Sequence, residues 1–242
     1  MEKKMIKVNT KKFFVLTSFS LVLAEARAID KVFTLGIKNG EVDYAYIKSR
    51  KEILEKHLKA LAKADVESMS AVEKKSFYIN AYNVFTLSLM ARHYPLKSIK
   101  DIPSSKRWSW KGWDVAGQKV SLDDIEHKML RPMGDPRIHF AINCASFSCP
   151  VLASEPYEAD QLDQLLNEAT KNFLEDEQRG LNFAQRKAYF GFGDEVEDVY
   201  VSKIFNWFGE DFIKSHGSVI AFIRAHVSEK VKQRLTKLED KD

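Results

Sequence analysis

A helix that is apolar almost all round is predicted over residues 71–93. Ser70 and Glu73 have the spacing of a capping box, and the helix ends at about His93 because Pro95 follows. A helix without a polar face must be covered by the rest of the chain. The chain has 242 residues, of which 45% are apolar, so it holds enough material for one large domain or two small ones. This composition excludes a disordered, collagen-like or disulfide-dense small protein.

The remaining pattern favours a single α+β domain, predominantly helical with a small, mainly antiparallel sheet. Apolar spacing predicts a helix over 43–64, followed after the central helix by an irregular segment over 96–120 with a hairpin at its end. Further along, we expect a short helix over 122–130, a buried strand over 137–143, a helix over 160–174, two or three strands over 181–201 and helices over 203–214 and 218–227. A charged tail, expected to be frayed, completes the chain. The organisation that follows is 29–69 as an N-terminal helical segment, 70–228 as one compact unit with it, and 229–242 as the tail.

Residues 1–28 have the pattern of an export signal. Five lysines precede the apolar run 13–24, and small residues follow that permit cleavage after Ala26 or Ala28. The run is shorter than the roughly 20 residues that span a bilayer. The alternative is a retained anchor helix. We expect a periplasmic or secreted protein with no stable membrane insertion after cleavage.

Charge gives no reason to expect a nucleic-acid partner. The net charge is +4, from 38 basic and 34 acidic residues. The first 28 residues hold six of the basic and two of the acidic ones, so the remainder is balanced at 32 of each. We therefore expect a small-molecule or peptide substrate.

Three buried polar groups stand out on the predicted helices. Asn80 and Asn83 lie on one narrow face of the central helix and need hydrogen-bond partners, either a catalytic group or loop backbone. Glu126 falls within the apolar sector of the helix over 122–130, while His127 and Arg131 share the next face. A buried carboxylate must be paired or have a raised pKa. Either Glu126 forms a structural ion pair, with Arg137 as partner, or it orients a histidine.

The strand predicted over 137–143 places Arg137, His139 and Asn143 on one face, directly before Cys144. A histidine beside a cysteine is the minimum apparatus for an activated thiolate, and Glu126 or Asn143 could fix the imidazole. Three other interpretations stay open. His139 is a hydrogen-bonded core residue, Cys144 and Cys149 form a short-loop disulfide, or the histidines and cysteines bind zinc, whose usual close cysteine spacing is absent. No motif for a cofactor is present, and we expect no metal.

The strings that carry these residues resemble the family called domain of unknown function 547. They are Y-I-N-A-Y-N at 78–83, S-L-D-D-I-E-H at 121–127, Arg131, and D-P-R-I-H-F-A-I-N-C-A-S-F-S-C-P at 135–150, with a weaker continuation around 204–212. The resemblance implies a domain found in exported bacterial proteins and in larger eukaryotic ones, without a settled activity.

Two functions from different classes follow. The first is a thiol-dependent hydrolase or acyl transferase, with Cys144 as nucleophile, His139 as base and Glu126 or Asn143 as its orienting group. Arg137, Arg131, Asn80, Asn83 and His127 would then bind the substrate. The second is a non-enzymatic binding module with a structural Cys144–Cys149 disulfide, its recognition surface formed by Trp108, Trp110 and Trp113.

Overall fold

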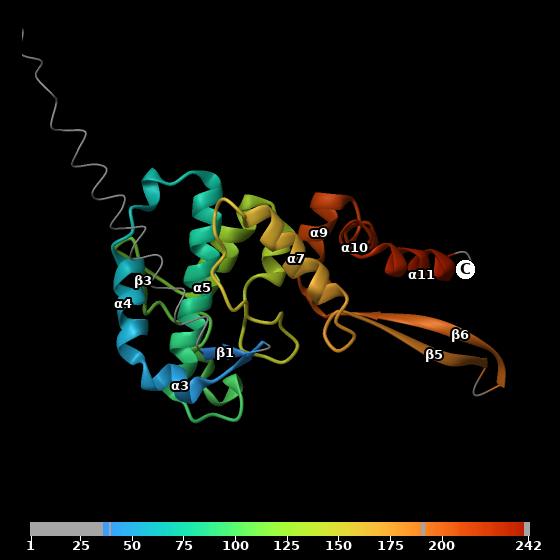
Figure 1. Ribbon diagram of the computed structural model, residues 1–242, viewed down its shortest axis with the longest axis horizontal. Helices are drawn as coiled ribbons and strands as arrows, with labels where there is room; N and C mark the ends of the chain where they lie inside the picture. The colour runs from blue at the N-terminus through green and yellow to red at the C-terminus, as the bar shows by residue number, and fades with distance from the viewer. Residues whose placement is uncertain (1–35, 39, 190–191, 240–242) are drawn as a thin grey trace, which may run out of the picture.

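The central apolar helix is α5, Ala71–His93, around which the first half of the chain is wrapped (Figure 1). The computed structural model describes residues 36–38, 40–189 and 192–239; the predicted export signal lies outside them. Ser70 and Glu73 form the expected capping box. The helix predicted over 43–64 is two helices, α3 (Tyr44–Ser49) and α4 (Lys51–Ala62), and both pack against α5.

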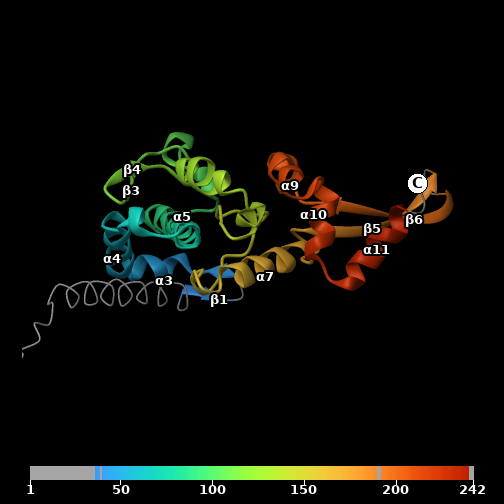
Figure 2. The ribbon, with the colours of Figure 1, turned by 90° about the horizontal axis from the view of Figure 1, so that it is seen from above.

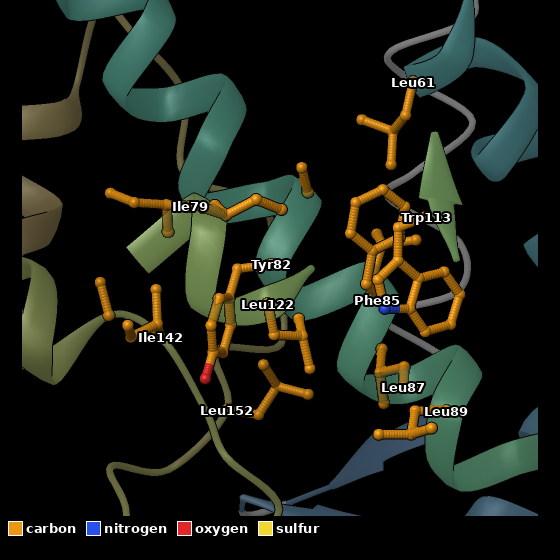
Figure 3. Close-up of a cluster of buried hydrophobic side chains, with 14 of the residues drawn as sticks. Leu61, Ile79, Tyr82, Phe85, Leu87, Leu89, Trp113, Leu122, Ile142 and Leu152 are labelled. Atoms are coloured by element: carbon orange, nitrogen blue, oxygen red, sulfur yellow. The ribbon is translucent and has the colours of Figure 1, made fainter. Parts of the chain in front are cut away.

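One hydrophobic core lies around α5 and is closed by a short hairpin. The hairpin is formed by β3 (Trp113–Val115) and β4 (Gln118–Val120). Its turn at Ala116 and Gly117 has positive φ angles, which suits glycine at the second position. Trp113 stacks on Phe85, with ring centroids 4.8 Å apart, among the leucines of α4 and α5 (Figure 3).

The structure buries one of the three tryptophans that were expected to form a recognition surface. Trp113 is 2% exposed, and Trp110 packs edge-on against it. Trp108 is half-buried against the same core. Trp113 and Trp108 therefore help to cover the central helix, whereas Trp110 remains 36% exposed.

The helix predicted over 122–130 changes its winding along its length. It begins as α6 (Leu122–Asp124), continues as a π-helix, η4 (Ile125–Leu130), and ends as a 3₁₀ turn, η5 (Arg131–Met133). The backbone N–H of Arg131 donates to the carbonyl of Glu126, five residues back, which is the π-helical pattern. Leu122, Ile125 and Leu130 are buried, as the apolar sector predicted.

The strand predicted over 137–143 is wrong. The segment is a 3₁₀ helix, η6 (Pro136–Phe140), started by Pro136 and by Asp135, whose side chain accepts from the backbone N–H of Arg137. The alternation that suggested a strand has another cause. Ile138 and Ile142 belong to the core around α5, whereas Phe140 belongs to a second core. The segment lies between two cores and buries side chains toward each.

The second core is an aromatic cluster formed by later elements, which lie beside the first unit in both views (Figures 1 and 2). Phe140 meets Phe173, Phe205, Phe212 and Phe222 there, with ring centroids 5.0–6.0 Å apart. The elements are α7 (Leu162–Leu174), α8 (Ile204–Trp207), α9 (Gly209–His216), α10 (Val219–His226) and α11 (Glu229–Glu239).

A long hairpin, β5 (Leu181–Tyr189) and β6 (Phe192–Val201), projects beyond this helical cluster (Figure 2). The tail expected to be frayed is instead α11. Its Leu235 is 3% exposed, and Arg234 donates to the Glu197 carboxylate of β6 at 3.0 Å. Charged residues thus cover a helix that is anchored on its other face.

The fold class is α+β and predominantly helical, as predicted. Over the described residues the strands form three separate antiparallel pairs, the third being β1 (Ile37–Lys38) with β2 (Glu41–Val42). No helix in those residues is long and apolar enough to cross a membrane.

Candidate functional site

Four of the side chains singled out from the sequence converge where η4 and η6 meet α9. Glu126, His127 and Arg131 come from η4 and the turn that follows it, and His139 comes from η6. Asp211 of α9 completes the group. We call these five residues the acid–base cluster.

His139 is the buried centre of the cluster. Its side chain is 1% exposed, and its Nε2 lies 2.9 Å from the Asp211 carboxylate. The ring stacks on Phe208 with centroids 4.0 Å apart. Burial lowers the pKa of His139 to about 4, outweighing the opposite effect of Asp211. The neutral ring therefore carries its hydrogen on Nε2, donates it to Asp211 and leaves the Nδ1 lone pair free.

Glu126 faces that lone pair. Its Oε1 lies 3.9 Å from His139 Nδ1, and its side chain is 12% exposed. Burial raises the pKa of Glu126 to about 7, and the nearby Asp123 carboxylate adds to the rise, while Arg131 and a hydrogen bond from the Tyr82 hydroxyl oppose it. Between about pH 4 and pH 7 the Glu126 carboxyl group is thus protonated while the His139 ring is neutral.

Arg131 connects this pair to α9. Its guanidinium donates two hydrogen bonds to Asp211, at 2.7 and 2.9 Å, and a third to His127 Nδ1 at 3.1 Å. The guanidinium also lies over the Phe208 ring, 5.4 Å from its centroid. Arg131 and His139 hold the pKa of Asp211 below its usual range, although burial alone would raise it. Asp211 therefore remains a charged acceptor for both.

The structure separates Arg137 from Glu126, so the predicted ion pair between them is wrong. Arg137 forms a two-point ion pair with Asp135, at 2.9 Å for each bond, and also donates to Asp163 at 2.8 Å. Lys75 binds the same Asp135 at 2.8 Å. The 3₁₀ helix causes the difference, because it turns Arg137 and His139 away from each other.

Asn80 and Asn83 hold backbone rather than a catalytic side chain. The Asn80 amide bonds to both the N–H and the carbonyl of Tyr157, each at 2.9 Å. Asn83 donates to the Ala141 carbonyl and accepts from the Asn143 N–H, again at 2.9 Å. The loop-backbone interpretation of the two amides is thus confirmed. Asn143 in turn donates to the Pro150 carbonyl and accepts from the Ala145 N–H, which shapes the loop after η6.

Cys144 and Cys149 form a disulfide, with their Cα atoms 6.1 Å apart. The disulfide alternative is therefore confirmed, and in this form Cys144 has no thiol to act as a nucleophile. Over the described residues there is no free cysteine and no group of three His, Cys, Asp or Glu side chains that could hold a metal ion.

Sequence reasoning assigned no role to three members of the site: Asp211, Tyr82 and Phe208. Tyr82 and Asp211 lie in strings that carry the family resemblance, and that was the available signal. A periodicity argument misses Asp211 because it joins the cluster from 72 residues further along the chain than His139.

Comparison with protein families finds one match. Residues 66–174 match the family described as Protein of unknown function, DUF547. This supports the resemblance over a little less than half of the chain, and the matched segment contains Tyr82, Glu126, Arg131 and His139. The weaker resemblance around 204–212, which includes Asp211, lies outside it. Neither the curated proteins nor the solved structures give a match.

Proposed function

We propose that the acid–base cluster is the active site of an enzyme that uses Glu126 as its general acid and base, in hydrolytic or acyl-transfer chemistry. The observation that carries this proposal is the partly exposed Glu126 beside the neutral His139. The environment shifts the pKa values of these two groups in opposite directions. Groups so perturbed are concentrated at functional sites. The π-helical winding that presents Glu126 is also frequent at such sites.

The proposed chemistry follows from the proton on Glu126. A carboxyl group with a pKa of about 7 is half ionised at neutral pH, so it can take a proton from an attacking water and return it to a leaving group. Asp211 fixes the His139 ring, so that its Nδ1 lone pair faces the Glu126 carboxyl group. The partly exposed Arg131 provides positive charge beside Glu126 for developing negative charge on the substrate.

Hydrolysis of p-nitrophenyl acetate over pH 5–9 tests this proposal. We expect a rate that changes half-maximally near pH 7 and falls at least a hundredfold in Glu126→Gln. The matched control is Glu177→Gln, which removes an exposed carboxylate outside the cluster and should leave the rate unchanged. The double variant Cys144→Ala/Cys149→Ala should also retain the activity. Activity that disappears in that double variant, or that arises only on reduction, would instead support the thiol mechanism.

A binding module is the second candidate, because the segment that follows the disulfide loop forms one wall of a cavity. That cavity is described below, and its occupancy is independent of the acid–base cluster.

We also propose that the chain is exported to an oxidising compartment. The pattern of residues 1–28 and the disulfide both support this, since structural disulfides persist chiefly outside the cytosol. Fractionation of cells that produce the full chain should recover it, shortened by about 26–28 residues, in the exported fraction. Full-length chain retained in the membrane fraction would favour an anchor.

A further inference from the structure

A cavity of about 470 Å³ lies between α7 and the extended segment 150–157. Its volume falls within the range of small-molecule sites. Phe140 and Phe173 line it from the second core, and Leu165 and Ala169 line it from α7. The lining is therefore largely apolar at its base.

The segment that forms one wall is fixed at both ends. At its start, the Pro150 carbonyl accepts from the Asn143 side chain at 2.6 Å, one residue after the disulfide. At its end, Tyr157 is held by Asn80 through both backbone groups. A wall anchored in this way loses little conformational freedom when a ligand binds.

Arg179 lines the cavity and contacts the disulfide loop. Its guanidinium lies 4.6 Å from the Phe147 ring centroid at the tip of the disulfide loop, and its Nε donates to the Phe147 carbonyl at 3.0 Å. The same guanidinium forms an ion pair with Asp176 at 2.6 Å. The charges of Arg179 and Asp176 thus neutralise each other.

Two further carboxylates line the cavity, Glu155 on the extended segment and Glu168 on α7, and both are exposed. Glu168 accepts a hydrogen bond from Gln164, which is neutral, and among the described residues neither Glu155 nor Glu168 has an ion-pair partner. The cavity therefore combines an aromatic base with a rim that carries excess negative charge. We propose that it binds a small organic cation, an apolar ring system that bears an ammonium or guanidinium group.

This site is distinct from the acid–base cluster although the two are adjacent along the chain. His139 belongs to the cluster, whereas the next residue, Phe140, lines the cavity. Both residues belong to η6, which contributes one side chain to each site. Loss of the proposed enzymatic activity and loss of ligand binding can therefore be measured separately.

Three fluorescent probes that share one ring system test the proposal on the full chain. They are dansylcadaverine, which is cationic, dansylamide, which is neutral, and dansylglycine, which is anionic. We expect saturable binding, with a Kd for the cation about fivefold to tenfold below that of the neutral probe, since two partly solvated carboxylates contribute modestly. The anion should bind most weakly. Raised salt should reduce the difference.

Variants locate the binding. Ala169→Trp should fill the cavity and abolish binding of all three probes, and Asn172→Trp, at an exposed lining position, does the same if the first variant fails to fold. Glu155→Gln with Glu168→Gln should remove the preference for the cation but keep ring binding, whereas Glu177→Gln should change neither. Absence of saturable binding, no preference for the cation, or binding that survives both tryptophan variants would overturn the proposal.

Discussion

Glu126 and His139 lie side by side in one buried environment, and that environment opposes charge on both. For Glu126 the pKa rises from 4.5 to about 7, so the folded protein keeps a proton that the unfolded chain releases. The resulting stability is complete below pH 4.5 and is lost as the pH rises to 7. For His139 the pKa falls from 6.5 to about 4, so its contribution is complete above pH 6.5 and is lost as the pH falls. Each contribution amounts to roughly 3 kcal/mol.

The contributions of Glu126 and His139 to stability change with pH in opposite directions. Between pH 4.5 and 6.5 they should therefore cancel, so that the free energy of unfolding of the wild type is nearly independent of pH. Glu126→Gln removes the pH dependence that Glu126 contributes, because the amide stays neutral at every pH. We expect the variant's free energy of unfolding to rise by roughly 3 kcal/mol from pH 4 to 6.5, and to exceed that of the wild type by roughly 3 kcal/mol at pH 8. Urea unfolding at intervals of half a pH unit measures both.

Glu177→Gln serves as the control for this series and should follow the wild-type curve. A Glu126→Gln protein that is destabilised equally at every pH would mean that Glu126 acts as an ionised partner in a structural ion pair.

At the scale of elements, most of the helices were predictable and the segment that forms the site was not. The central helix α5 carries its own start signal at Ser70, and the hairpin β3–β4 its own turn glycine. The segment 137–143 has no comparable local signal for its 3₁₀ conformation beyond Pro136. Its alternating pattern reflects two cores on either side of it, which only the folded chain brings together.

The residues of the site also divide into those that local spacing predicts and those that only the folded chain brings together. Residues four apart on one helix could be placed on one face, and Arg131 does contact His127. The partner of His139 could not be found in this way, because Asp211 belongs to a distant helix. Spacing also could not decide between a thiol and a disulfide, since both are compatible with two cysteines five residues apart.

The disulfide loop is the element for which a direct energetic prediction can be made. Closing so short a loop restricts the unfolded chain modestly, so Cys144→Ala/Cys149→Ala should lower the free energy of unfolding by roughly 2 kcal/mol. Guanidinium unfolding with and without dithiothreitol measures this, and reduction should destabilise only the wild type. A wild-type protein whose stability does not change on reduction would show that the loop is not closed in solution.

At the scale of the whole molecule, the acid–base cluster connects two hydrophobic cores. Asp211 comes from the helices of the second core, while Arg131 and His139 come from the turns beside the first. Phe140, the residue after His139, also connects the two cores, because its side chain packs in the aromatic cluster of the second core. A second connection runs through α7, whose Leu166 belongs to the first core and whose Phe173 belongs to the second.

Asp211→Asn should therefore loosen one core more than the other. Arg131 loses its ionised partner, which we expect to cost about 2 kcal/mol because the guanidinium remains partly exposed. Hydrogen exchange should accelerate in α9 and α10 while the amides of α4 and α5 keep their protection.

Glu210→Gln, at the neighbouring exposed position, should leave both sets of amides unchanged. Uniform acceleration in all four helices of Asp211→Asn would show that the two cores unfold as one cooperative unit.

The π-helix η4 has a consequence for how this sequence can vary. Its wider turn places Arg131 one residue further along than an α-helix would, and successive residues of a helix differ by about 100° in direction. Deletion of one residue inside this turn would let the Arg131 N–H bond to the Glu126 carbonyl four residues back, as in an α-helix, so Arg131 would keep its direction toward Asp211. An inserted residue would instead turn Arg131 away from Asp211 by about 100°. Homologous chains that retain the cluster should therefore tolerate the loss of one residue here, with a return to α-helical winding, but no insertion.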